Sequence, residues 1–151
     1  YILFVGGVFY RAARVDNDDS IKPESFYKQR CFEVVTKIFE AVYQNDDMGF
    51  EQLQHLYNLH QGIAGHEANG GKNEDIVRYH LERAMECCEK STLVKDHTLT
   101  HPMLYGWCVA DAPSDNTMIL KLMKKTLAEK SYDDFRSCEW FQKLESKITA
   151  L

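Results

Sequence analysis

The fold is decided by residues 53–90, which read LQHLYNLHQGIAGHEANGGKNEDIVRYHLERAMECCEK. Apolar and small residues recur every three or four positions in both halves of this stretch, which is the spacing of one helix face. Between the halves, Gly70 and Gly71 predict a turn with positive φ, and Asn73 predicts the N-cap of a second helix. Because a short loop makes consecutive helices antiparallel neighbours, we predict a helical hairpin over residues 48–91.

Two further glycines, Gly62 and Gly65, fall inside the first helix of this hairpin. A glycine inside a helix costs about 1 kcal/mol relative to alanine, so its presence asks for a compensating reason. We expect another helix to pack closely at this level, where a side chain would be in the way. The alternative is that these glycines only weaken or bend the helix.

The rest of the chain is predicted to be helical as well. Helical spacing of apolar residues predicts helices over 26–43, 117–130 and 137–151, and a short helix after Pro102. Residues 45–47 are expected to cap the helix that starts at 48, and Asp115 or Asn116 the helix that starts at 117, whereas residues 131–135 are expected to form a loop. No segment predicts a strand. Paired helices with short connections favour an all-α fold of stacked antiparallel hairpins, an α-solenoid, over a four-helix bundle.

Composition narrows the class of protein. The 151 residues are 44% hydrophobic, which suits a single domain over residues 1–151. The net charge of −5 is a poor match to nucleic acid, which needs a basic face. The apolar run at residues 1–9 is shorter than the ~20 residues of a membrane span, so we expect residues 1–14 to be the end of an upstream helix, in a fragment of a longer protein. Five cysteines without a Cys-x-x-Cys pair predict reduced thiols and a cytoplasmic protein.

Motifs for chemistry are incomplete. His97 and His101 have the i, i+4 spacing of a helical metal site, but Pro102 follows directly. The stretch from Gly65 to Lys72 resembles a phosphate loop only in its glycines, which a helix C-cap explains better. Paired carboxylates such as Asp133-Asp134 lie among polar residues, as helix caps and solvated surfaces do. We therefore predict no catalytic residues, no metal ligands and no cofactor.

Two segments resemble the C-terminal, tetratricopeptide-like (TPR) region of bacterial XRE-type helix-turn-helix transcriptional regulators. In the first, residues 63–84 resemble the small residue, glycine turn and late alanine of the repeat, although Val77 stands where alanine is usual and the loop is one residue longer. In the second, residues 131–144, SYDDFRSCEWFQKL, are similar to the closing segment of such proteins. The resemblance covers most of residues 16–151 and implies a TPR-like superhelix. It also implies an upstream DNA-binding domain, of which these residues contain no trace.

The leading hypothesis is therefore a regulatory domain that binds a peptide, a protein or a second subunit, with a homodimer as one possibility and without direct contact to nucleic acid or membrane. A concave surface of such an array is lined by the first helix of each pair. The residues expected there are Gln54, Tyr57, Asn58, Gln61 and Glu67.

Five further aromatic and polar residues are candidates for the same binding surface. The alternative is that the aromatic ones belong to the core and the polar ones to the ordinary surface. These residues are His60, Tyr79, His80, Tyr105 and Trp107. The second hypothesis is a stand-alone TPR scaffold or adaptor. The third, which the spacing does not favour, is a metal- or cofactor-dependent helical enzyme.

Overall fold

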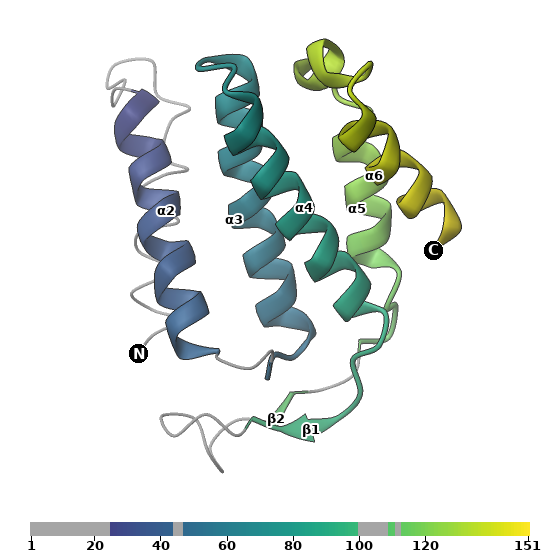
Figure 1. Cartoon of the computed structure of the whole chain (residues 1–151). Coiled ribbons are helices and arrows are strands. Elements are labelled where there is room, and N and C mark those ends of the chain that lie inside the picture. Colours follow the sequence, from purple (N-terminus) through teal and green to yellow (C-terminus); the bar gives the residue numbers. More distant parts are fainter. Residues whose placement is uncertain (1–24, 44–46, 100–108, 111–112) are drawn as a thin grey trace.

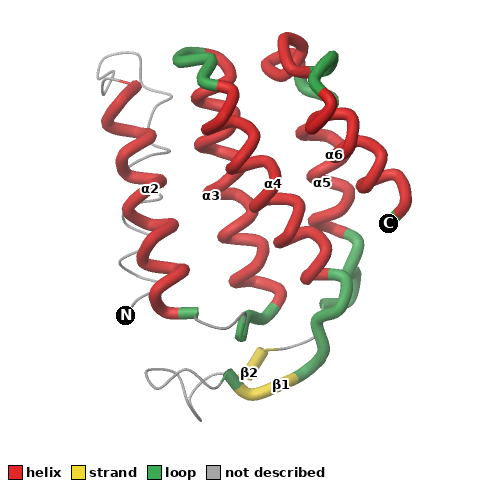
Figure 2. The backbone as a smooth tube through the Cα atoms, viewed as in Figure 1, coloured by secondary structure: helices red, strands yellow, loops and turns green. Residues whose placement is uncertain are grey.

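The structure, a computed structural model, describes residues 25–43, 47–99, 109–110 and 113–151. Its helices are α2 (Ser25–Val42), α3 (Phe50–Asn69), α4 (Glu74–Ser91), α5 (Met118–Leu127), the 3-10 helix η2 (Lys130–Phe135) and α6 (Glu139–Ala150). Two residues of β1 (His97–Thr98) pair antiparallel with two of β2 (Val109–Ala110). The described chain is thus mostly helical, as Figures 1 and 2 show, and the prediction of an all-α fold is confirmed.

The helices stack as neighbours around the α3–α4 hairpin. α2 packs against α3 on one side, while α5 and α6 pack on the other side, and α4 and α6 lie in front of α3 and α5 in the view of Figure 1. α3 is the central element, because its buried residues face α2, α4 and α5. One continuous core runs through the array and includes Phe39 of α2, Ile63 of α3, Leu81 of α4, Met123 of α5 and Phe141 of α6.

The hairpin over residues 48–91 is confirmed, with two details at its helix starts. α3 begins at Phe50 and its N-cap is Gly49, which has no side chain to accept a capping hydrogen bond. Residues 45 and 46 lie outside the described residues. The N-cap of α4 is Asn73, whose Oδ1 accepts a hydrogen bond from the backbone N–H of Ile76 at 3.3 Å, as predicted.

The turn between these helices forms as predicted, but the positive φ that we expected at its glycines lies at another residue. Gly70 has a negative φ of −118°, and the positive φ of 53° belongs to Lys72. Glu67, which is only 7% exposed, holds the turn: its carbonyl accepts from Lys72 N at 2.7 Å, and its carboxylate accepts from Asn73 N at 3.1 Å. A Cβ on Gly71 would run into that carboxylate. Gly71 therefore provides room for a buried acceptor, not a left-handed backbone.

The expectation that another helix packs closely at the glycines inside α3 is confirmed at Gly62. A Cβ on Gly62 would lie 3.3 Å from the ring of Phe32 in α2, and one on Gly65 would lie 3.4 Å from the hydroxyl of Tyr132 in η2. The first distance is shorter than most Cβ contacts, so the missing side chain of Gly62 lets α2 approach α3 closely, whereas the second is at the short end of ordinary contact. Their helix propensity cost is offset by the packing of these neighbours.

The C-terminal part follows the predicted pattern with shorter elements. α5 and α6 begin and end a few residues inside the predicted ranges, and residues 131–135 form a 3-10 helix instead of a loop. The N-cap of α5 is Thr117 and not Asp115 or Asn116 as predicted; Asp115 instead accepts from the N–H of Thr117 at 2.9 Å, just ahead of the helix. The paired strands at 97–98 and 109–110 were not predicted, and the helix expected after Pro102 lies outside the described residues.

In the part of the chain that the structure describes, no helix has the length and apolarity to cross a membrane.

The role of Gly71 predicts the effect of one methyl group. Gly71→Ala should push the Glu67 carboxylate off Asn73 N and reduce the free energy of unfolding by about 1 kcal/mol, the usual worth of such a hydrogen bond. Urea denaturation measures the change. Gly70→Ala is the matched control, because its Cβ would meet nothing closer than a carbonyl at 3.4 Å, and it should not destabilise. Equal losses in both variants would contradict this account of the turn.

Candidate functional site

The predicted binding residues of α3 divide into a surface stripe and two core residues. Gln54, Asn58 and Gln61 are half-buried and lie at i, i+4 and i+7, so they share one stripe of the helix. His60 contacts α4 through His80, and it stands roughly 200° around the helix from Asn58, at ~100° per residue. The stripe therefore faces away from α4. That side of α3 is bordered by α2 and by η2, against which Gly62 and Gly65 pack.

Tyr57 does not lie on this surface, which corrects the prediction. It is 2% exposed, and its hydroxyl shares a hydrogen bond of 2.8 Å with the hydroxyl of Thr126 in α5. Burial raises the pKa of Tyr57 to about 12, so the ring stays neutral and ties α3 to α5. An i, i+3 step from Gln54 placed Tyr57 near the stripe in sequence, but its large apolar ring is better satisfied in the core. Glu67 is likewise buried, in the α3–α4 turn.

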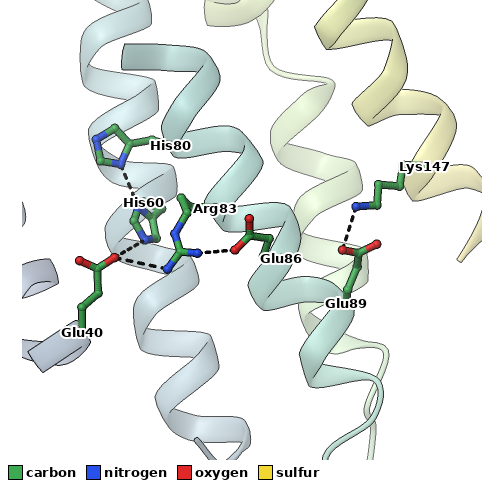
Figure 3. A network of polar contacts seen from close by, with 7 residues as sticks. All are labelled: Glu40, His60, His80, Arg83, Glu86, Glu89 and Lys147. Atoms are coloured by element: carbon green, nitrogen blue, oxygen red, sulfur yellow. Dashed lines mark hydrogen bonds and ion pairs between the residues drawn. The ribbon is translucent and has the colours of Figure 1, made fainter. Parts of the chain in front are cut away.

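A partly buried polar network joins α2, α3 and α4 (Figure 3). At its centre is His60 of α3, which is fully buried. Its Nδ1 lies 2.8 Å from Nδ1 of His80 in α4, and its Nε2 lies 4.0 Å from a carboxylate oxygen of Glu40 in α2. Tyr79 covers the pair, with its ring 5.0 Å from that of His80 and 6.5 Å from that of His60.

Arg83 extends the network across the helices. Its guanidinium lies 3.4 Å from the same Glu40 oxygen and pairs with Glu86 on the next turn of α4. Its Nε, like Nε2 of His60, has no hydrogen-bond partner among the described residues. Glu40 is thus the acceptor toward which both the imidazole and the guanidinium are directed, and α2 is linked through it to the hairpin.

The two imidazoles can share only one proton between their Nδ1 atoms. Of the two arrangements, Nε2–H on His60 with Nδ1–H on His80 directs an N–H toward the Glu40 carboxylate, which can only accept. The opposite arrangement would aim a lone pair of His60 at a carboxylate. We therefore assign His60 as the Nε2–H tautomer and His80 as the donor between the rings.

Both rings are held neutral by their surroundings. Burial lowers the pKa of His60 to about 3, with further contributions from the neighbouring His80 and the Arg83 cation. Burial also lowers the pKa of His80 to about 4, against a smaller opposite effect of Glu33. A proton added to Nδ1 of His60 would place a cation next to Arg83 and leave the N–H of His80 without its acceptor.

Sequence reasoning treated these histidines as ordinary, although a signal for their pairing is present. His60 and His80 are each ten residues from Gly70. In an antiparallel hairpin with equal rise per residue, positions equidistant from the turn lie at the same level. Spacing along one helix does not detect a pair that faces across two helices.

The other candidate metal ligands and nucleophiles do not form a site in the described residues. In the described residues, no group of three or more His, Cys, Asp and Glu side chains is arranged to hold a metal ion. His97 begins a strand instead of a helix, and His101 lies outside the described residues, as do Tyr105 and Trp107. Cys87 and Cys88 are buried free thiols, and burial raises their pKa to about 12 and about 11, which makes them poor nucleophiles.

Comparison with known proteins identifies no relative: no family model matches the sequence, and no match was found among curated proteins or solved structures.

The buried pair predicts an acid-sensitive fold. Folding lowers the pKa of His60 from its usual 6.5 to about 3. Between these pH values the unfolded chain binds a proton on this ring, whereas the folded chain does not. The contribution to stability is complete above pH 6.5 and is lost as the pH falls toward 3. Between pH 7 and 5 this ring alone should cost about 1 to 2 kcal/mol of unfolding free energy.

Urea denaturation at the two pH values measures this loss, and His60→Leu should reduce it while keeping a side chain of similar size. His55→Ala, at an exposed position of the same helix, is the control and should keep the wild-type pH dependence. A His60→Leu variant that loses as much stability in acid as the wild type would refute the assignment.

Proposed function

We propose that this chain is a non-enzymatic interaction domain, a TPR-like array of stacked hairpins that binds a peptide or protein segment along α3. The observation that supports it most is the position of α3. This helix is packed on α2, α4 and α5, yet it keeps the stripe of Gln54, Asn58 and Gln61 partly open to solvent. A rigid helix that presents amides in a row provides donors and acceptors suited to an extended backbone.

The wider role we propose is that of a regulatory domain in a cytoplasmic transcriptional regulator of the XRE helix-turn-helix type. This part rests on the resemblance of residues 63–84 and 131–144 to the TPR-like region of such proteins. α2 is the helix by which ligand binding would reach an upstream DNA-binding domain, because it lies first among the described helices and contacts the array through α3. Binding would shift the population between two packings of α2 on the hairpin.

A display screen of random peptides against the 151-residue chain tests the binding function. We expect recovered peptides to lose at least ~10-fold in affinity against the triple variant Gln54→Ala, Asn58→Ala, Gln61→Ala, because each lost amide leaves a peptide group without its partner. The matched control changes Gln142, Ser146 and Thr149 to alanine, which repeats the same i, i+4, i+7 spacing on the exposed side of α6. Affinity lost equally in both triple variants, or the recovery of no peptide, would contradict a binding stripe on α3.

The regulatory role has a separate test. Extending the coding sequence upstream of Tyr1 should reveal a helix-turn-helix with a basic recognition helix. A different upstream domain would leave the interaction function in place and favour a scaffold.

A further inference from the structure

The opposite side of the array has a groove of its own, between α4 and α6. Its volume is about 480 Å³, and its floor consists of Met85 of α4 with Trp140 and Leu144 of α6. These three side chains are at most 8% exposed, so only their edges reach the base of the groove, where they form a narrow apolar strip. The polar stripe of α3 faces away from α4, so this groove is a second surface and does not depend on the first.

The two helices that form the groove run in the same direction. Near their N-termini, Nε1 of Trp140 donates to Glu74 at 2.8 Å, and toward their C-termini Lys147 pairs with Glu89 at 2.8 Å. Figure 1 shows α4 and α6 side by side with this orientation, and Figure 3 shows the Lys147–Glu89 pair. The groove is therefore bounded by two parallel rims whose charges can be compared along its length.

The rims carry opposite charge. On α4, Glu82 and Glu86 follow each other at i, i+4 and are more than 40% exposed. On α6, Lys143 and Lys147 have the same spacing and are 73% and 49% exposed. Most of the groove thus has one acidic rim and one basic rim.

At the N-terminal mouth of the groove the signs are exchanged, with Arg78 on α4 and Glu139 on α6.

These charges do not neutralise each other across the groove. Arg78 pairs with Glu82 inside α4, and Glu139 pairs with Lys143 inside α6, both at i, i+4. Lys147 reaches α4, but its partner Glu89 is not among the residues that line the groove. Exposed pairs of this type contribute little to stability, so their side chains are readily re-paired with charges on a bound molecule.

We propose that the α4–α6 groove docks an amphipathic helix of a partner protein, with its apolar face on the strip of Met85, Trp140 and Leu144. The charges specify the helix: one flank basic, against Glu82 and Glu86, and the other acidic, against Lys143 and Lys147. The rim of α6 from Glu139 to Lys147 spans two helical turns, about 12 Å, so two turns of the partner are held. An extended peptide would present its side chains alternately up and down and could not place both charge signs beside one apolar row.

Three designed peptides test this groove. All share one apolar face and are locked as helices by a hydrocarbon crosslink on the outer side, and they differ only in their flanks: Lys and Glu on opposite flanks, Lys on both, or Glu on both. Fluorescence anisotropy at low salt should show the mixed peptide binding the wild-type chain about tenfold more tightly than either uniform peptide. Equal affinities for the three peptides, or binding of none, would overturn the proposal.

Charge reversal on one rim should change the peptide preference in one direction, and charge reversal on the other rim should change it in the opposite direction. Charges that only stabilise the fold would not change the preference. Lys143→Glu with Lys147→Glu makes both rims acidic and should transfer the preference to the all-Lys peptide. Glu82→Lys with Glu86→Lys makes both rims basic and should transfer it to the all-Glu peptide. Lys143→Glu alone keeps the Lys147–Glu89 pair and should shift the preference in the same direction by a smaller factor. Unchanged preferences in folded variants would refute the assignment of the flanks.

The alanine triple variant of Gln54, Asn58 and Gln61 should bind the mixed peptide as the wild type does. If library peptides bind the α3 stripe while the helical peptides fail, only the groove proposal falls. If the helical peptides bind and no library peptide is recovered, only the proposal for α3 falls.

Discussion

The close packing of α3 against its neighbours is the constraint on which the rest of the structure depends. A helix with neighbours on three sides needs small residues where those neighbours approach most closely. Gly62 admits the ring of Phe32, and Gly65 admits the hydroxyl end of Tyr132. Glycine lowers the helix propensity at both positions, but it allows contact between segments that are distant in sequence. The close approach of α2 thus depends on Gly62, and η2 contacts α3 at Gly65.

The same packing buries polar side chains in α3. Their hydrogen-bond partners differ between the turn and the middle of the helix. Near the turn, the Glu67 carboxylate accepts a backbone N–H and uses the space left by Gly71. Farther from the turn, His60 has one firm partner, His80, and a distant one, Glu40. The first arrangement is complete and local, whereas the second links three helices and leaves Nε2 of His60 without a direct hydrogen bond. A buried network satisfied only in part is where a fold responds most to a change of charge.

These features give the array two dissimilar faces. The α3 face presents uncharged amides, which suit a partner recognised through its backbone, while the α4–α6 groove presents two charged rims over an apolar strip, which suit a helix. The junction at Glu40 lies between α2 and α4, so a shift of α2 would alter the ion pair with Arg83. α4 carries that arginine and also forms one wall of the groove. α4 is therefore the helix that the Glu40 junction and the groove share.

The sequence by itself determined what depends on local pattern. The period of apolar residues located the described α-helices to within a few residues, Asn73 was recognised as an N-cap, and the mid-helix glycines indicated close packing, because each of these effects acts within one or two helical turns. Only the tertiary structure decided which side chains meet. It put Tyr57 into the core with Thr126, gave the left-handed φ to Lys72 and reserved the space at Gly71 for Glu67. It also paired His60 with His80 across the hairpin and set a rim on α4 opposite a rim on α6. The physical reason is that spacing along a chain fixes the face of a helix, whereas the partner of that face depends on how separate helices stack.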